Sequence, residues 1–233
     1  MNSLPHNQRP SEWRRLFAIA RDLIEQVQIQ TGGLDFDYSF GGGTAMMLQI
    51  GHRESHDVDL FVDDPQLLGF LDPEKADLRF KTMPSEYGGD GARFQKFTFA
   101  ELGEIDIIVA RPLSSKPFEM IEIDGQSVKI ETVAEIITKK VYHRGGEAKA
   151  RDIFDIAAAA QTHRAETVTA LRAYPDQVGQ TLSRLAALNP EFVLSTISQL
   201  MIKPEYRPIV PTSLATVDGL LREALEKGPS LEF

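Results

Sequence analysis

The sequence predicts an α+β protein: a small mixed β-sheet flanked by helices, followed by a helical second half. Up to residue 131, short runs that alternate apolar and polar residues stand between glycine-rich turns, a pattern typical of strands. From residue 132 onward, apolar residues recur at helical spacing and prolines separate the helical stretches. With 233 residues, 42% of them hydrophobic, the chain is long enough to bury a substantial core.

Each element of the first half has its own signal. A helix is predicted where apolar side chains recur on one face over residues 11–29, which Thr31-Gly32-Gly33 closes. A β-prone run at 36–40 leads into three glycines and then an apolar stretch at 45–50. The later segments alternate or turn as strands do, at 58–62, 93–99, 105–110, and in a hairpin of 120–123 with 126–130 around Asp124-Gly125.

The second half begins with a capping signal. Thr132 followed by Glu135 predicts the start of a helix that continues to about His143, and a second helix is expected over 151–162. We therefore divide the chain into a core at 1–131 and a helical region at 132–233. Because no polar linker separates them, we expect the helical region to pack on the core and to complete the active site.

The composition excludes several classes of protein. Cysteine is absent, so disulfide bonds and thiolate metal sites are ruled out. No apolar run approaches the roughly 18 residues of a membrane span, and no signal peptide is recognisable at the start. We therefore expect a cytoplasmic protein with no membrane contact. The net charge of −9 argues against a surface that binds nucleic acid broadly.

Carboxylates on the predicted strands suggest a metal site. Asp57 and Asp59 are two residues apart, so both side chains leave the same face of the sheet. Such close carboxylates repel unless a cation sits between them, and their hard oxygens suit Mg²⁺, with Mn²⁺ as an alternative. Asp106 lies on a later apolar strand; if that strand is a neighbour, three acids converge. They could then hold two Mg²⁺ ions and deprotonate an attacking hydroxyl, with Glu104 as a substitute for Asp106.

A glycine turn precedes these acids. Gly42 and Gly43 stand directly before a short predicted helix, whose backbone N–H groups can face a phosphate. Thr44 could donate its hydroxyl to that phosphate, or it could cap the helix.

A basic island lies further along, where residues 139–151 hold five basic side chains against Glu147 alone. Lys140 falls on the apolar stripe of its helix, where a lysine is costly unless an anion meets it. Lys139 falls off the stripe and is expected to be solvated, so we favour Lys140 as the phosphate contact. Asp152 stands in the first turn of the next helix, where the helix field alone would favour a carboxylate.

Two histidines show the spacing of a zinc pair. His52 and His56 are four residues apart, but Gly51 and the oncoming strand argue against a continuous helix there. We therefore do not assign them to a metal.

The conjunction of Gly42-Gly43 with Asp57-x-Asp59 resembles the nucleotidyltransferase superfamily of DNA polymerase β. The segment from Gly42-Gly43-Thr44-Ala45 to Arg53-x-Ser55-x-Asp57-Val58-Asp59-Leu60-Phe61 is similar to the AbiEii/AbiGii family, the toxins of type IV toxin–antitoxin systems. Those proteins also carry a helical lysine and then Arg-Asp-x-x-Asp, which corresponds here to Lys140 and to residues 151–155. The resemblance covers roughly residues 38–158.

The resemblance implies a Mg²⁺-dependent nucleotidyltransferase that moves a nucleoside monophosphate from an NTP onto RNA, with a tRNA 3′ end as the expected acceptor and a separate antitoxin as partner. It implies that Arg53 and Ser55 help to hold nucleotide or to orient the acids. It also places Asp152 in the site, pairing with Lys140 or Arg151 or acting on the nucleophile. Asp106 and Asp152 both remain candidates for the general base, and Asp155 is expected to support the fold.

The predicted sites are therefore a nucleotide cradle, a metal site and a set of catalytic residues. The nucleotide-binding residues are Gly42, Gly43, Thr44, Arg53, Ser55 and Lys140; the metal ligands are Asp57, Asp59 and Asp106; the catalytic residues are Asp57, Asp59, Asp106, Lys140 and Asp152. Two alternatives stay open. The same chemistry could modify a small-molecule or protein hydroxyl, or the chain could be a non-catalytic module that binds nucleotide.

Overall fold

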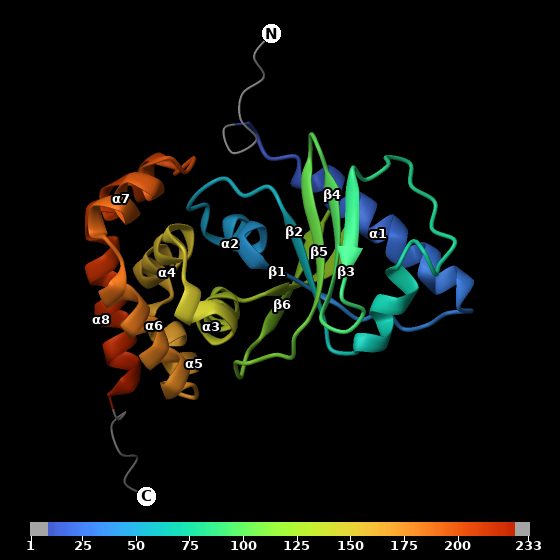
Figure 1. Ribbon diagram of the computed structural model, residues 1–233. Helices are drawn as coiled ribbons and strands as arrows, with labels where there is room; N and C mark the ends of the chain where they lie inside the picture. The colour runs from blue at the N-terminus through green and yellow to red at the C-terminus, as the bar shows by residue number, and fades with distance from the viewer. Residues whose placement is uncertain (1–8, 227–233) are drawn as a thin grey trace, which may run out of the picture. The chain divides into compact units, whose positions relative to one another are not determined.

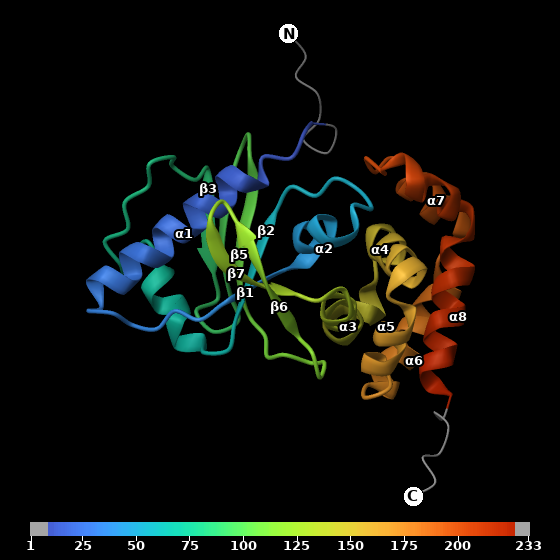
Figure 2. The same cartoon turned by 180° about the vertical axis from the view of Figure 1, so that it is seen from behind.

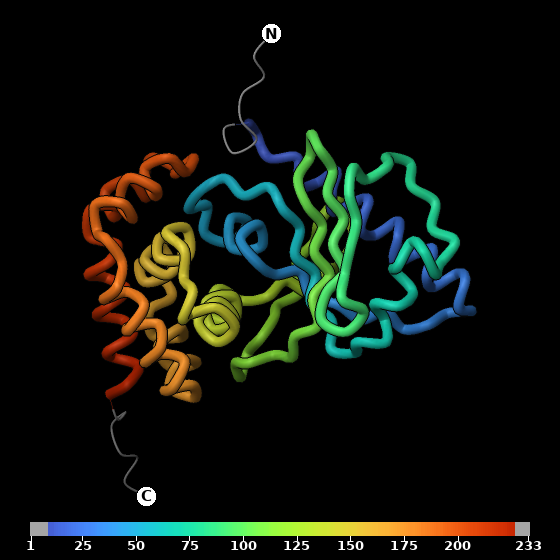
Figure 3. The backbone as a smooth tube through the Cα atoms, viewed as in Figure 1, coloured from blue at the N-terminus to red at the C-terminus, as the bar shows by residue number. Residues whose placement is uncertain are grey.

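The computed structural model describes residues 9–226, which form two compact units. The first unit contains residues 9–48, 54–112 and 118–131. The second contains residues 49–53, 113–117 and 132–226, so two short segments of the first half belong with the helices of the second. Figure 3 traces the backbone of both units.

A mixed seven-stranded sheet forms the centre of the first unit, in the order β3-β4-β5-β2-β1-β7-β6 (Figure 1). Two neighbouring pairs, β2 with β5 and β1 with β7, are parallel, and the other pairs are antiparallel. This confirms the predicted α+β class. The strands are β1 (Ser39–Gly41), β2 (Val58–Val62), β3 (Glu86–Gly89), β4 (Phe94–Phe99), β5 (Gly103–Val109), β6 (Phe118–Ile123) and β7 (Gln126–Glu131).

Helix α1 (Trp13–Gln30) covers one face of this sheet (Figures 1 and 2). Its buried stripe meets the apolar side of the strands, and the ring of Phe17 stacks on that of Phe40 at 4.9 Å between centroids. Leu60 of β2 and Ile105 of β5 are fully buried on this side. Because side chains alternate along a strand, the residues between them, including Asp59 and Asp106, point to the opposite face.

Helix α2 (Gly42–Ile50) begins directly after β1, and its first residue is a glycine that has little room for a side chain. Gly42 has φ +67°, in the left-handed region that side chains rarely adopt. A Cβ atom at this position would also collide with the carboxylate of Asp59. The turn therefore brings backbone against an acidic side chain with no room for another atom.

Two local predictions for the first unit concern its hairpin and its first strand. The hairpin turn is confirmed, with Asp124 at φ 49° and Gly125 at φ 78° between β6 and β7. The strand expected at 36–40 is shorter and later, at Ser39–Gly41, because its pairing with β2 involves only residues 39–41. Neither β3 nor the 3-10 helix η2 (Pro65–Leu71) was expected from the sequence.

The second unit is helical, as predicted. Helix α8 packs against α4, α5 and α6, and α3 also contacts α4, α5 and α6. Small side chains at Ala157, Ala158 and Ala159 are fully buried in α4, which permits close helix packing. The elements are α3 (Val133–Arg144), η3 (Gly145–Glu147), α4 (Ala150–Thr162), α5 (Arg164–Leu171), α6 (Pro175–Ala187), α7 (Pro190–Ser198), η4 (Pro204–Thr212) and α8 (Ser213–Leu225).

The start of α3 follows half of the expected capping box. The Thr132 side chain accepts a hydrogen bond from the backbone N–H of Glu135 at 3.3 Å, which confirms the cap. The Glu135 carboxylate does not return to Thr132; it accepts from the backbone N–H groups of Leu113 at 2.9 Å and Ser114 at 2.7 Å. The buried Glu135 carboxylate therefore holds the start of the 113–117 segment against α3.

Between residues 9 and 226, none of the helices combines the length and the apolar character that a membrane crossing requires.

Replacing Gly42 with alanine should destabilise the protein more than replacing Gly51. Both glycines have positive φ, so each alanine incurs a backbone cost of about 1–2 kcal/mol. Only Gly42 faces Asp59, whereas no atom lies within 4 Å of a Cβ built on Gly51, so the clash should add about 1–3 kcal/mol. Urea unfolding of the two variants measures the difference. Equal losses would contradict the close approach of Asp59 to this turn.

Candidate functional site

Two acids of the first unit lie side by side because their strands are parallel neighbours. In the register of β2 with β5, Asp59 pairs with Asp106, which confirms that the two predicted strands adjoin. Gly41 of β1 lies opposite Asp59, and Lys96 of β4 lies opposite Asp106. We call these four residues, Gly41, Asp59, Asp106 and Lys96, the acidic row.

The environment of Asp106 favours its protonated form. Burial raises the pKa of this carboxyl, the neighbouring Asp59 raises it further, and Lys96 only partly opposes them, so that the pKa is about 7. The Asp106 side chain is 17% exposed. Two carboxylates in this position are the donor set that a hard cation would stabilise.

Asp57 directly precedes β2, and its carboxylate is turned toward the neighbouring strand β5. Its Oδ1 accepts a hydrogen bond from the backbone N–H of Glu104 at 3.1 Å. Over residues 9–226, no three His, Asp or Glu side chains stand close enough to hold a metal by themselves. Mg²⁺ commonly takes only one or two protein carboxylates and fills its shell with water and substrate phosphate. The pair Asp59 and Asp106 fits that requirement.

The glycine turn and the acidic strand are joined by Thr44. This residue is fully buried, and its hydroxyl donates to the backbone carbonyl of Asp57 at 2.5 Å. The observed contact is neither a helix cap nor a contact with solvent; it ties the first turn of α2 to the start of β2. Gly42 and Gly43 remain at the helix start, where backbone N–H groups favour an anion.

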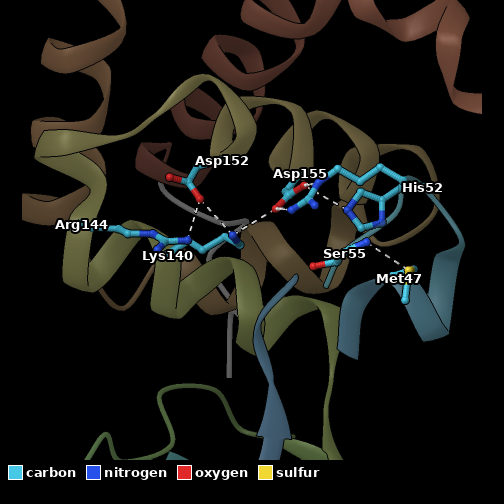
Figure 4. A network of polar contacts seen from close by, with 8 residues as sticks. Met47, His52, Ser55, Lys140, Arg144, Asp152 and Asp155 are labelled. Atoms are coloured by element: carbon cyan, nitrogen blue, oxygen red, sulfur yellow. Dashed lines mark hydrogen bonds and ion pairs between the residues drawn. The ribbon is translucent and has the colours of Figure 1, made fainter. Parts of the chain in front are cut away.

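Ser55, a predicted nucleotide contact, is connected through its backbone. Its N–H donates to the sulfur of Met47 at 3.3 Å (Figure 4). Its carbonyl accepts from the Ser11 hydroxyl at 2.5 Å. These contacts hold the chain just before Asp57 against α2 and against the residues that precede α1 in the same unit.

A buried charge network lies in the second unit, centred on Asp155 of α4 (Figure 4). Arg53 donates to it twice, from Nε at 2.7 Å and from Nη2 at 2.9 Å. His52 Nε2 lies 3.0 Å from its Oδ1, and Lys140 Nζ lies 3.0 Å from its Oδ2. Asp155 is wholly buried and therefore binds the 49–53 segment to α3 and α4.

Lys140 also pairs with Asp152, one of the alternatives that the family resemblance implied for this aspartate. Its ammonium lies 2.9 Å from Asp152 Oδ1, and the Arg144 guanidinium lies 2.7 Å from the same oxygen. The other oxygen of Asp152 accepts from the backbone N–H of Lys149 at 3.2 Å, which caps α4. Asp152 thus serves the helix start and the charge network together.

The network fixes the protonation of its members. Burial alone would raise the pKa of Asp155, but Arg53, Lys140 and His52 outweigh it and hold that pKa well below its ordinary value. Burial would likewise raise the pKa of Asp152, but Lys140 and Arg144 lower it. Burial lowers the pKa of His52, which is therefore neutral at pH 7 and donates through Nε2, since a carboxylate can only accept.

The expectation that Lys139 is solvated is wrong. Lys139 is 5% exposed, and its ammonium lies 3.7 Å from Glu135, one helix turn away. The residues of α3 from Val133 to Val141 are all buried, so a position off the apolar stripe is enclosed as well. An acidic neighbour four residues earlier makes that burial tolerable.

Two residues of these centres were not assigned by sequence reasoning. Lys96 enters the acidic row because β4 pairs with β5, and the only advance signal was its position on an alternating strand.

His52 contacts Asp155, whereas His56 Nε2 lies 2.9 Å from the Arg9 carbonyl, so the two histidines do not share a ligand.

Comparison with known proteins places this geometry in context. The family model described as "Nucleotidyl transferase AbiEii toxin, Type IV TA system" matches residues 28–223. A search of curated proteins found no match. The chain is similar in structure to JHP933 from Helicobacter pylori, with 14% identity and a TM-score of 0.49, covering 93% of each chain. It is also similar to MenT4, a nucleotidyltransferase toxin from Mycobacterium tuberculosis H37Rv, with 20% identity, a TM-score of 0.49, and coverage of 91% of this chain and 87% of that chain.

The change Asp155→Asn should destabilise the second unit strongly. It keeps the shape of the side chain but leaves Arg53 and Lys140 buried without their shared anion, a loss of about 3–5 kcal/mol. Denaturant unfolding followed by circular dichroism measures this loss. The control Asp176→Asn, at an exposed position in the first turn of α6, should lose less than about 1 kcal/mol. Similar losses in both variants would show that the network is not a buried charge centre.

The change Asp106→Asn should stabilise the metal-free protein in a pH-dependent way. The pKa of Asp106 is raised to about 7 in the folded state, so ionising this group costs stability increasingly from pH 4 to pH 7. The advantage of the asparagine variant should therefore grow by about 2 kcal/mol between pH 5 and pH 8 and level off above pH 7. Unfolding free energies of both proteins at pH 5, pH 7 and pH 8 measure this difference. An advantage of Asp106→Asn that did not change with pH would contradict the raised pKa of this carboxyl.

Proposed function

Because this chain belongs to the AbiEii family of nucleotidyltransferase toxins of type IV toxin–antitoxin systems, we propose that it transfers a nucleoside monophosphate from an NTP to the 3′ end of RNA. We propose a tRNA as the acceptor, Mg²⁺ as the metal, and a cognate antitoxin as the partner that restrains the toxin. The observation that carries the metal chemistry is the pairing of Asp59 with Asp106 across β2 and β5.

The proposed roles in the first unit follow from the polar face of the sheet. Asp59 and Asp106 would hold Mg²⁺, with the second oxygen of Asp57 as a further ligand. When bound, the metal offsets phosphate charge and makes the acceptor hydroxyl easier to deprotonate. The backbone N–H groups at Gly42 and Gly43 would face the triphosphate. Thr44 would act through Asp57, whose carbonyl it holds, and Ser55 would position the start of the acidic strand.

The proposed roles in the second unit follow from the charge network. Two of the three N–H donors of Lys140 meet Asp152 and Asp155, which leaves the third for a phosphate oxygen. Three cations, Arg53, Lys140 and Arg144, face these two carboxylates, so the network keeps an excess positive charge. We propose that Lys140 neutralises charge on the phosphates and that Arg53 keeps Asp155 and the 49–53 segment in place.

The proposed reaction is an in-line displacement. The 3′-hydroxyl oxygen of the acceptor bonds to the α-phosphorus as the bond from that phosphorus to the bridging oxygen breaks, and pyrophosphate leaves. The hydroxyl proton passes to a carboxylate. Asp106 is the better acceptor of that proton, because both oxygens of Asp152 are engaged and its pKa is lowered.

A labelling experiment tests this function. Purified protein, Mg²⁺, total RNA and each labelled NTP in turn should give label in RNA, whereas the double variant Asp57→Ala/Asp59→Ala should lose at least about 10³-fold in rate because the metal ligands are gone. The control is Asp63→Asn, at an exposed position outside the acidic row, which should label RNA normally.

The outcome also separates the alternatives. Label on a small molecule or on protein, but not on RNA, would replace the acceptor and keep the transfer chemistry. NTP binding without transfer to any acceptor would favour a nucleotide-binding module and would contradict the proposed function.

A further inference from the structure

Lys96 is the one cation of the acidic row, and the proposed transfer chemistry does not use it. It extends from β4, whose register places it opposite Asp106 of β5. Its ammonium lies 2.6 Å from Glu104 Oε2 and 3.4 Å from Asp106 Oδ1, so it bridges two carboxylates that are two residues apart on one strand. Thr98 adds a longer contact to Glu104 at 3.5 Å.

The face around Lys96 is crowded with negative charge. Asp59, Glu104 and Asp106 all leave the same side of two adjacent strands, and Asp57 directly precedes Val58 at the start of β2. Carboxylates at this spacing repel one another in the absence of a cation. The Lys96 ammonium lies close enough to Glu104 and Asp106 to offset part of this negative charge.

We propose that Lys96 is a positioning residue of the metal site, a built-in counter-cation that holds Glu104 and Asp106 in place and limits the affinity of the acidic row for a divalent metal. This inference rests on the proposed function and extends it to the control of metal affinity. With Lys96 present, the metal-free row is already partly neutralised, and a divalent ion enters against a nearby positive charge. The phosphates of the NTP supply the missing negative charge, so metal and nucleotide bind most tightly together.

The positive charge of Lys96 is therefore the reason that the nucleotide-free protein should bind metal weakly. Removing a unit positive charge a few ångströms from a divalent ion strengthens binding about tenfold in a solvent-like dielectric. The same removal should destabilise the metal-free protein, because the carboxylates lose their counter-cation. Metal should restore that stability.

The test measures Mn²⁺ binding to nucleotide-free protein by electron paramagnetic resonance, under argon at pH 8.5, together with the melting temperature. The variant Lys96→Met should bind Mn²⁺ about tenfold more tightly than the unaltered protein. It should also melt at a lower temperature without metal and recover when Mn²⁺ is added. Lys96→Arg keeps the charge and should resemble the unaltered protein in both measurements.

The chain offers a matched control. Lys129 also lies on a strand of the sheet and contacts one carboxylate, that of Asp37 at 2.6 Å, but it stands outside the acidic row. Lys129→Met should leave Mn²⁺ affinity unchanged. A folded Lys96→Met variant whose affinity is unchanged or weaker would overturn the proposal, and so would a failure of every protein to bind Mn²⁺.

The two proposals fail separately. If Lys96→Met tightens Mn²⁺ binding but RNA is not labelled, the role of Lys96 stands and the acceptor is wrong. If RNA is labelled but Mn²⁺ affinity does not respond to Lys96, the transfer function stands and the role of Lys96 is wrong.

Discussion

The parallel pairing of β2 with β5 sets Asp59 beside Asp106, and the surrounding structure compensates for that costly juxtaposition. Neighbouring carboxylates in a partly buried place repel, which is the reason that the pKa of Asp106 rises to about 7. Space and charge are both adjusted around them. Gly42 leaves room for the Asp59 carboxylate, and Lys96 supplies positive charge to Asp106. A carboxyl pKa raised by burial and by a neighbouring charge is typical of a functional site.

The second unit shows the opposite balance of charge. Around Asp155 and Asp152, the three cations Arg53, Lys140 and Arg144 face two carboxylates, and each oxygen of Asp155 meets more than one donor. A buried network of this kind contributes little net stability compared with an apolar core, so its retention favours a functional reason. It also fixes His52 and Arg53, which stand only a few residues before Asp57 along the chain. The acidic strand therefore follows a segment whose position is set by buried ion pairs.

The sequence alone was enough to identify the acidic residues of the candidate metal site, but not the residues that surround them in the fold. Alternation along a strand is enough to place Asp59 on the face opposite the apolar side chains of β2, and the capping residue Thr132 is enough to predict the start of α3. Lys96 could not be assigned to the acidic row, because strand order and register depend on contacts between distant segments. Strand β3 was missed for a similar reason: the sequence of Glu86–Gly89 has little strand propensity, and it is extended because β4 provides a partner. Lys139 was misjudged because helical periodicity alone does not reveal a helix that is buried on every side.

Anomalous X-ray scattering tests most directly whether Asp59 and Asp106 form a divalent-metal site. Crystals of the protein grown with Mn²⁺ and a non-hydrolysable NTP analogue would locate the metal without reference to activity. We expect an anomalous peak within about 2.0–2.5 Å of a carboxylate oxygen from each of these two residues. Phosphate oxygens and water should complete the coordination shell of the metal. A fully occupied peak bound elsewhere, or nucleotide bound with no metal between these carboxylates, would contradict it.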